Sequence, residues 1–280
     1  MAESLADMVK RDSCPVRRSF VQRDSPDEGL TPLARLLRTQ DEVGGKGAGL
    51  RITLLLSVLW ICAKEPYTTT RVAPYWAELL SRPDPAEEGA RAIRDCLREL
   101  KSRGLVDLRA RGKRIEIAPS LETSTAELPF PYVPPYQDEP YISVPRAFWT
   151  SGVAGALSGA GAAMYLCALA MTRHDQPSFF ISGDFFDTHY GISRSSRKRG
   201  LSELQKFGVL SAEVVEGVSL ETFKKTKRNV YTLAPDFAQP GPREIPPEEQ
   251  ARIDASKAKA RQKAEAMKAI EELMKVPTEK

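Results

Sequence analysis

The chain has 280 residues, of which 41% are hydrophobic, and this is enough apolar content for packed cores in one or two domains. Its formal net charge of +4 does not by itself indicate a binding partner. The longest apolar run, residues 54–62, is too short to cross a bilayer, and the N-terminus lacks the apolar core of a signal peptide. We therefore expect neither a membrane protein nor a secreted one.

The first part of the chain predicts a tail followed by three helices and a hairpin. Residues 1–30 are polar and without periodicity, and we expect a disordered tail there. Within a predicted domain at 31–118, apolar patterns indicate helices at 33–37, 51–63 and 73–80. Asp84 as N-cap, Pro85 at the first helical position and Glu87 three residues after the cap predict the start of a further helix, which ends at Gly104. Strands at 105–108 and 114–117 then form a basic hairpin.

The second part repeats this order after a proline-rich linker at 119–140. A second predicted domain at 141–237 contains an edge strand at 141–144, a strand at 179–181 and a hairpin of strands 209–215 and 230–233. Its predicted helices lie at 146–157, 161–171, 183–190 and 194–207. Residues 238–280 predict a proline-rich hinge and a charged C-terminal helix, with an apolar stripe of Met267, Ile270, Leu273 and Met274.

A short motif occurs in both halves at a constant spacing of 104 positions. In the first half it consists of Leu97, Glu99, Leu100, Gly104 and Leu105. In the second half the same places hold Leu201, Glu203, Leu204, Gly208 and Val209. Because each copy ends a helix and precedes a hairpin, the pattern indicates two copies of one structural unit.

The segment 190–204 carries a resemblance to a known family. Its turn glycine (Gly191), capping serine (Ser193), hydroxyl pair and Leu-x-x-Leu spacing resemble the turn and recognition helix of bacterial winged helix-turn-helix regulators. Ser196 replaces the usual threonine, and Arg197 stands where an apolar residue is usual. The resemblance covers residues 160–235 and, more weakly, 50–118. It implies a mainly α fold with small β-hairpin wings, made of two winged helix-turn-helix domains plus the C-terminal charged helix.

Positive charge is concentrated in the second copy. Between residues 193 and 228 nine basic residues face four acidic ones, so this segment carries +5 and the rest of the chain about −1. At 100° per residue, Leu201, Leu204 and Gly208 share one side of the helix, and the other side holds Ser195, Lys198, Arg199, Ser202 and Lys206. That side is suited to the major groove of DNA. The candidate DNA-contacting residues are Ser193, Arg194, Ser195, Ser196, Lys198, Arg199, Ser202 and Lys206 on the helix, and Lys224, Lys225, Lys227 and Arg228 on a wing at 216–228.

The corresponding helix of the first half mixes charges. Glu87, Glu88 and Asp95 accompany the candidate residues Arg91, Arg94 and Arg98, and the spacings Glu87–Arg91 and Arg91–Asp95 favour intrahelical pairs. A salt-bridged solvent face and a DNA contact are both open here, and so is a surface for a partner protein or second protomer. The wing residues Arg109, Arg111, Lys113 and Arg114 are candidates for phosphate contact.

Residues for catalysis or metal binding do not form a recognisable pattern. His174 and His189 have no Cys, His or acidic residues at the spacing of metal ligands. The glycine-rich stretch at 44–47 lacks the Ser or Thr that follows the lysine of a phosphate-binding loop. Asp184 is interpreted as a helix N-terminal acid rather than half of a pair with Asp187, and Gly155 to Gly161 as permitting close helix packing. Cys62, Cys96 and Cys167 lie in apolar patterns, which is typical of free thiols in a reducing compartment. We expect no enzyme, no cofactor and no metal.

Three functions follow as hypotheses. The first is a sequence-specific transcriptional regulator acting on double-stranded DNA in the cytoplasm, at the nucleoid. The second is a replication initiator of a plasmid or mobile element, a family that the tandem arrangement also resembles. The third is a protein-interaction adaptor built on the same fold. We also expect a homodimer or a partner contact through the first domain or the C-terminal helix.

Overall fold

The computed structural model describes residues 5–6, 9, 11–38, 47–135, 139–218 and 225–241. Residues 1–240 form one compact unit, and the predicted C-terminal helix lies outside the described residues. Helices account for 45% of the described structure and strands for 21%, and the strands form three small sheets. The chain is therefore a mixture of helix and strand, and the prediction of a mainly α fold made of two winged helix-turn-helix domains is wrong. Strands proved longer than the apolar pattern indicated, and an unexpected sheet forms at the N-terminus.

Residues 48–119, here called module 1, follow the predicted order of elements. The helices are α4 (Ala48–Ile61), α5 (Ala73–Leu79) and α6 (Glu88–Ser102), followed by the hairpin β2 (Val106–Arg111) and β3 (Arg114–Pro119). Thr69 adds an antiparallel bridge to Ile117 of β3. Helix α6 begins at Glu88, later than predicted, because residues 85–87 form a turn and Glu87 is the N-cap, with non-helical φ and ψ of −115° and −81°. The Asp84 carboxylate still accepts the amides of Glu87 and Glu88, each at 3.4 Å.

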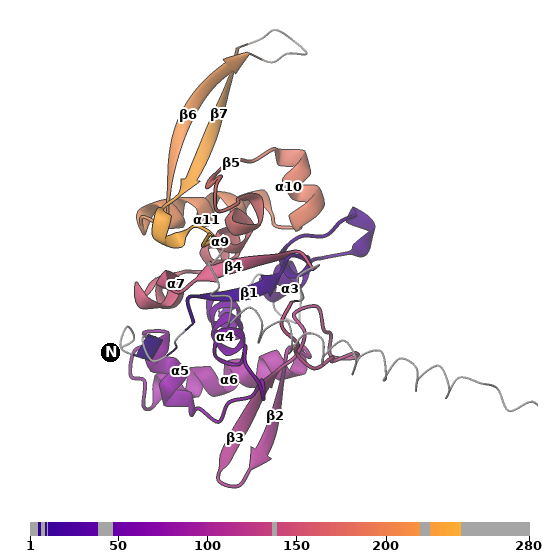
Figure 1. The fold of residues 1–280 in the computed structure, drawn as a ribbon, viewed down its shortest axis with the longest axis vertical. Helices are drawn as coiled ribbons and strands as arrows, with labels where there is room; N and C mark the ends of the chain where they lie inside the picture. Colours follow the sequence, from indigo (N-terminus) through magenta and orange to yellow (C-terminus); the bar gives the residue numbers. More distant parts are fainter. Residues whose placement is uncertain are drawn as a thin grey trace, which may run out of the picture. The chain divides into compact units, whose positions relative to one another are not determined.

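Residues 159–233, here called module 2, contain the same order of three helices and a hairpin, with one strand added between the first two helices. They comprise α9 (Gly159–Met171), β5 (Ser178–Phe180), α10 (Gly183–Tyr190), α11 (Arg194–Lys206), β6 (Leu210–Val218) and β7 (Lys225–Leu233), with the sheet order β5-β7-β6. The hairpin is longer than predicted, since strand pairing continues to Val218 opposite Lys225. The cations expected in a loop at 216–228 therefore lie on strand β7 from residue 225 onward. The hairpins of the two modules project from opposite ends of the compact unit (Figure 1).

The repeated sequence motif has the same backbone structure in both modules. Helix α6 is followed by Gly104 and helix α11 by Gly208, with positive φ values of 76° and 68°. In each module the residue after the glycine donates its N–H to the carbonyl five positions earlier, at 3.0 Å and 2.9 Å. These are the bonds of a helix C-cap that requires a left-handed residue, which glycine adopts without strain. The helix ends predicted from Gly104 and Gly208 are confirmed.

The N-terminal segment (residues 11–38) is ordered, so the prediction of a disordered tail at 1–30 is wrong for the described part. It forms β1 (Ser13–Arg17), α2 (Arg18–Val21), the 3-10 turn η1 (Pro26–Glu28) and α3 (Pro32–Leu36). Strand β1 pairs antiparallel with β4 (Tyr141–Pro145). Arg17 in this segment is 7% exposed, and its Nη1 lies 2.7 Å from Oε2 of the fully buried Glu122. The sequence of this segment is polar partly because it contains a charged residue that is buried in a hydrogen-bonded ion pair, and such a residue cannot be distinguished by sequence from a solvent-exposed one.

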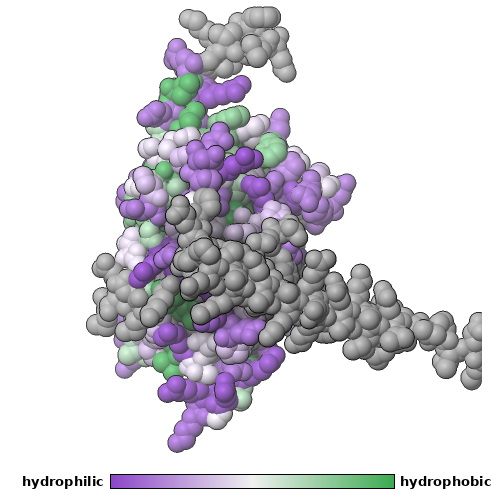
Figure 2. All heavy atoms as spheres, in the orientation of Figure 1, coloured by the Kyte–Doolittle hydropathy of each residue, from purple (hydrophilic) through white to green (hydrophobic). Residues whose placement is uncertain are grey.

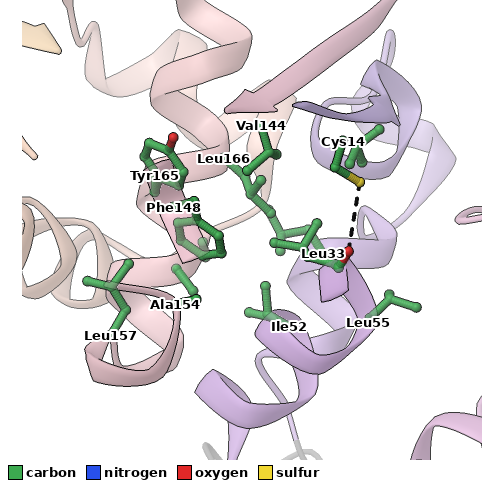
Figure 3. Packing of buried hydrophobic residues seen from close by; sticks show 14 of the residues in the cluster. Cys14, Leu33, Ile52, Leu55, Val144, Phe148, Ala154, Leu157, Tyr165 and Leu166 are labelled. Atoms are coloured by element: carbon green, nitrogen blue, oxygen red, sulfur yellow. Dashed lines mark hydrogen bonds between the residues drawn. The ribbon is translucent and has the colours of Figure 1, made fainter. Parts of the chain in front are cut away.

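Residues between the modules pack onto the same unit. The proline-rich stretch carries the buried Glu122 and Tyr132, and the predicted helix at 146–157 is divided into α7 (Ala147–Thr150) and α8 (Val153–Ala156) because Gly152 has a φ of 78°. Figure 3 shows residues of both modules and of β1 in one cluster, with the Cys14 thiol 3.8 Å from the carbonyl of Leu56.

Glycines allow helices of the two modules to approach closely. A Cβ at Gly159 of α9 would lie 2.5 Å from the Cβ of Ala48 in α4, and one at Gly155 would lie 2.1 Å from the carbonyl oxygen of Leu80. Both distances are shorter than atoms tolerate, so a side chain at either position would force the elements apart. The predicted role of the 155–161 glycines in close packing is confirmed.

Candidate nucleic-acid interface

Helix α11 is anchored by the side predicted to face inward. Leu201 is 7% exposed and Leu204 is fully buried. Gly200 lies directly against α9, where an added Cβ would meet the carbonyl oxygen of Ala160 at 2.3 Å. These contacts fix both the rotation of α11 about its axis and its distance from the core. The opposite side of the helix is consequently presented to solvent.

The start of α11 is capped by the serine that the sequence indicated. Ser193 is the N-cap, and its Oγ accepts the amide of Ser196 at 3.3 Å. The same Oγ lies 3.1 Å from the hydroxyls of Ser195 and Ser196. Ser193 and Ser195 are exposed and Ser196 is half-buried. The first turn therefore offers a cluster of hydroxyls beside helix amides, which favours negatively charged groups.

Cations occupy the solvent side of α11, and we call this surface the α11 face. Lys198, Arg199 and Lys206 are exposed there, together with Ser195 and Ser202, and Arg194 is exposed at the first position of the helix. Among the described residues, no carboxylate lies within 4.0 Å of the charged nitrogens of these four side chains. The acid of this helix, Glu203, is turned toward α9, where Oε1 accepts the amide of Ser158 at 2.8 Å. The positive charge of the α11 face is thus not neutralised locally.

Arg197 does not belong to the α11 face. Its Nη1 lies 3.2 Å from Oδ1 of Asp187, and its guanidinium lies 5.1 Å from the ring centre of Phe186. Both partners are on α10, and the Arg197 side chain is only 13% exposed. The arginine therefore packs against α10 and is not presented to solvent.

In the β6–β7 hairpin, both of the predicted wing cations whose side chains the structure describes have a partner. Lys227 lies 2.8 Å from Oε1 of Glu216, and the Arg228 guanidinium lies 5.4 Å from the ring centre of Phe180. Lys225 is placed only by its backbone on β7, and Lys224 lies outside the described residues. Val214 and Val215 are 64% and 47% exposed, and the hydrophobic colour on the hairpin in Figure 2 interrupts a mostly hydrophilic face.

Module 1 places its helix cations differently. Arg91, Arg94 and Arg98 are exposed on α6, but Arg98 forms an ion pair with Asp95 three residues earlier. The predicted Glu87–Arg91 and Arg91–Asp95 pairs are not found among the described residues, because Glu87 precedes the helix and Asp95 is engaged with Arg98. An acid therefore lies among the cations on the solvent side of α6.

The module 1 hairpin is also partly neutralised. Arg109 lies 2.7 Å from Asp107, and its hydrogen bond to that carboxyl lowers the pKa of Asp107. Arg111 lies 2.7 Å from Glu116. The remaining two candidate wing residues, Lys113 and Arg114, are exposed at and beside the turn. Among the described residues, this hairpin presents two cations without a carboxylate partner near its tip and two ion pairs along its strands.

Reactive groups do not converge elsewhere in the described part of the chain. It contains no group of three or more His, Cys, Asp or Glu residues arranged to hold a metal ion. No helix in the same residues has the length and apolarity needed to span a membrane. All four cysteines are free and buried, and burial raises the pKa of the Cys62 and Cys96 thiols to about 12.

Comparison with protein-family models, with curated proteins and with solved structures finds no match for this chain. A functional assignment therefore has to rest on the geometry and charge of its own surfaces. The α11 face is the strongest candidate, because it combines a rigid helix, exposed hydroxyls and cations that lack an acidic partner among the described residues.

Proposed function

We propose that the protein binds double-stranded DNA with the α11 face in the major groove and the β6–β7 hairpin along the backbone or in the minor groove. The observation that carries the proposal is the set of four exposed cations on α11 without an acidic partner among the described residues. Arginine and lysine can donate to guanine edges, and serine can bond to a base or a phosphate. The resemblance of residues 190–204 to a recognition helix supports the same proposal.

For the biological process, we propose regulation of transcription at the nucleoid. Initiation of plasmid or mobile-element replication is a second candidate, favoured by the presence of two modules of which one has its helix cations partly neutralised by Asp95. Such a division suits a protein that reads repeated sites with one module and contacts other proteins with the other. Sites at promoters would favour regulation, and repeats beside the gene's own origin would favour initiation.

The direct test is selection of genomic fragments bound by the purified full chain, followed by affinity measurements on a selected duplex at several stated salt concentrations. We expect affinity to fall with rising salt, and Lys198→Gln to lower the salt slope by about one if Lys198 neutralises one phosphate. Arg94→Gln removes one charge from α6 and serves as the matched control. Absence of binding to any duplex at low salt contradicts the proposal and favours the adaptor function.

A further inference from the structure

Helix α10 ends in a turn that leads directly into α11. The last four carbonyls of a helix have no partner within it, and here they belong to residues 187–190. All four accept hydrogen bonds from the N-terminal segment, to which sequence analysis assigned no role. Three of the donors belong to Arg23: its Nη2 lies 3.4 Å from the carbonyl of residue 187, its Nε 2.6 Å from that of residue 188, and its backbone amide 2.9 Å from that of residue 189. The fourth donor is Thr31 Oγ1, which lies 3.2 Å from the carbonyl of residue 190.

Arg23 makes most of these bonds. Its positive charge lies at the negative end of the α10 dipole, where a cation is stabilising. Its Nη1 also donates to the carbonyls of Pro26 and Gly29, so the guanidinium joins the 26–29 loop to the helix end. In return, Nδ1 of His189 lies 3.0 Å from the carbonyl of Arg23. Because a carbonyl only accepts, the proton of that bond is on Nδ1.

The turn itself is enclosed by the same segment. Thr31 is 2% exposed, and it also caps α3 by accepting the amide of Ala34 at 3.1 Å. Gly191 has a φ of 65°, and an added Cβ there would lie 3.3 Å from the Leu30 side chain. The segment is fixed at its other end by the pairing of β1 with β4. The turn before α11 is therefore held against a strand that belongs to the core.

We propose that residues 22–31 act as an external cap that sets the position of the α11 N-terminal turn, with Arg23 as the positioning residue. The proposal rests on the DNA-binding function above. Gly200 and the leucines fix the middle and end of α11, whereas its first turn, which carries Arg194 and Ser195, is continuous with the turn that Arg23 and Thr31 hold. Loss of the cap lets this turn sample other positions and lowers the fraction of chains ready to bind.

The test uses the full chain with Arg23→Gln, Arg23→Lys and the control Arg71→Gln. Arg71 stacks on Tyr75 in module 1, so this control removes an arginine from a site remote in function. We expect Arg23→Gln to weaken DNA binding by about tenfold with the salt slope unchanged, because Arg23 donates to carbonyls and not to phosphates. Lysine keeps the positive charge but lacks the several N–H donors of the planar guanidinium, so Arg23→Lys is expected to weaken DNA binding almost as much as Arg23→Gln.

Amide hydrogen exchange supplies a readout that does not depend on DNA. Residues 187–196 are expected to exchange faster in both Arg23 variants and unchanged in Arg71→Gln, while α9 keeps its protection in all three. A reduced salt slope in Arg23→Gln, restored by lysine, would show a direct phosphate contact and overturn the positioning role. Wild-type affinity in both Arg23 variants also overturns it. Failure of the wild type to bind any duplex, with the exchange effect intact, contradicts the proposed function and leaves the external cap standing.

Discussion

Modules 1 and 2 share a backbone plan but differ in where their carboxylates lie. The repeated glutamate is structural in both: Glu99 of α6 pairs with Arg51 of α4 at 3.1 Å, and Glu203 of α11 accepts the amide and the hydroxyl of Ser158, the N-cap of α9. Each ties the third helix of its module to the first. The solvent sides of the helices are not constrained in this way, and there Asp95 neutralises Arg98 in module 1.

The structure shared by the two modules and the charge of their solvent sides are therefore set by different residues. Inward leucines, the glutamate tether and the C-terminal glycine are common to both helices, so they account for the shared structure. The exposed acids Glu88 and Asp95 make the solvent side of α6 mixed in charge, whereas the one acid of α11, Glu203, is turned toward α9 and leaves the solvent side of α11 positive. Four predictions test whether the modules are equal in structure and unequal in binding.

The largest expected effect concerns the equality of structure. Leu100 and Leu204 occupy the same place in the two modules and both are fully buried. Leu100→Ala and Leu204→Ala should each lower the free energy of unfolding by about 2–5 kcal/mol, through lost burial and a residual cavity. Urea denaturation measures this, with the exposed Leu128→Ala as control. Because the two modules share one core, each variant should shift a single transition; two separate transitions would show that the modules fold independently.

The second prediction concerns the inequality of binding. Arg199→Ala should cost about 1–3 kcal/mol of DNA-binding free energy and relax the preference at one base pair, if the side chain meets a base edge. Arg98→Ala removes the same side chain from α6, where Asp95 already compensates its charge, and should change affinity by less than about 0.5 kcal/mol. Titration of both variants against a set of single-base operator variants gives the comparison. Equal losses would mean that module 1 contacts DNA as well.

The third prediction uses a buried thiol of module 1. Burial raises the pKa of Cys96 from 9.0 to about 12. The unfolded chain loses this proton first, so the stabilisation is fully present below about pH 9 and is lost as the pH rises toward 12. Each such thiol should lower the free energy of unfolding by about 1.4 kcal/mol per pH unit in this window.

Denaturation between pH 9 and 11 should therefore show a shallower pH dependence in Cys96→Ala than in the wild type. Thiol labelling of the native protein completes the comparison of modules. Cys96 is 6% exposed and Cys167 of module 2 is fully buried, so Cys96 should react first. Faster labelling of Cys167 would indicate that module 2 opens more readily and would reverse the expected order of local stability.

The smallest effect is a gain rather than a loss. Asp95→Asn removes the ion-pair partner of Arg98 on the solvent side of α6. Because this ion pair is exposed, its loss is expected to change the free energy of unfolding by no more than about 0.5 kcal/mol. If acid placement alone separates the modules, this variant should raise the salt-dependent affinity for nonspecific DNA slightly, while Glu116→Gln on the module 1 hairpin does the same by freeing Arg111. An unchanged affinity in both variants would show that module 1 is kept from DNA by its shape.

Local pattern predicted a large part of the molecule. Helices α4, α10 and α11, the serine cap at Ser193 and the two C-terminal glycines depend on neighbours a few residues away, and the sequence contains those neighbours. The inward side of α11 was predictable for the same reason, because helical geometry assigns Leu201 and Leu204 to one side. The candidate residues of α11 therefore followed from the sequence alone.

Tertiary structure alone decided the rest. The pairing of β1 with β4, the buried pair of Arg17 and Glu122 and the hold of Arg23 on α10 join residues that are far apart in the chain. A buried, paired arginine has the same letter as a solvated one, so composition predicted a disordered tail where the fold placed a strand. The same ambiguity applied to Arg197, whose direction was settled by Asp187 and Phe186 on a neighbouring helix. Whether a charged side chain is buried or exposed depends on its partners in the folded structure, because the free-energy cost of burying an ion depends on the groups that surround it.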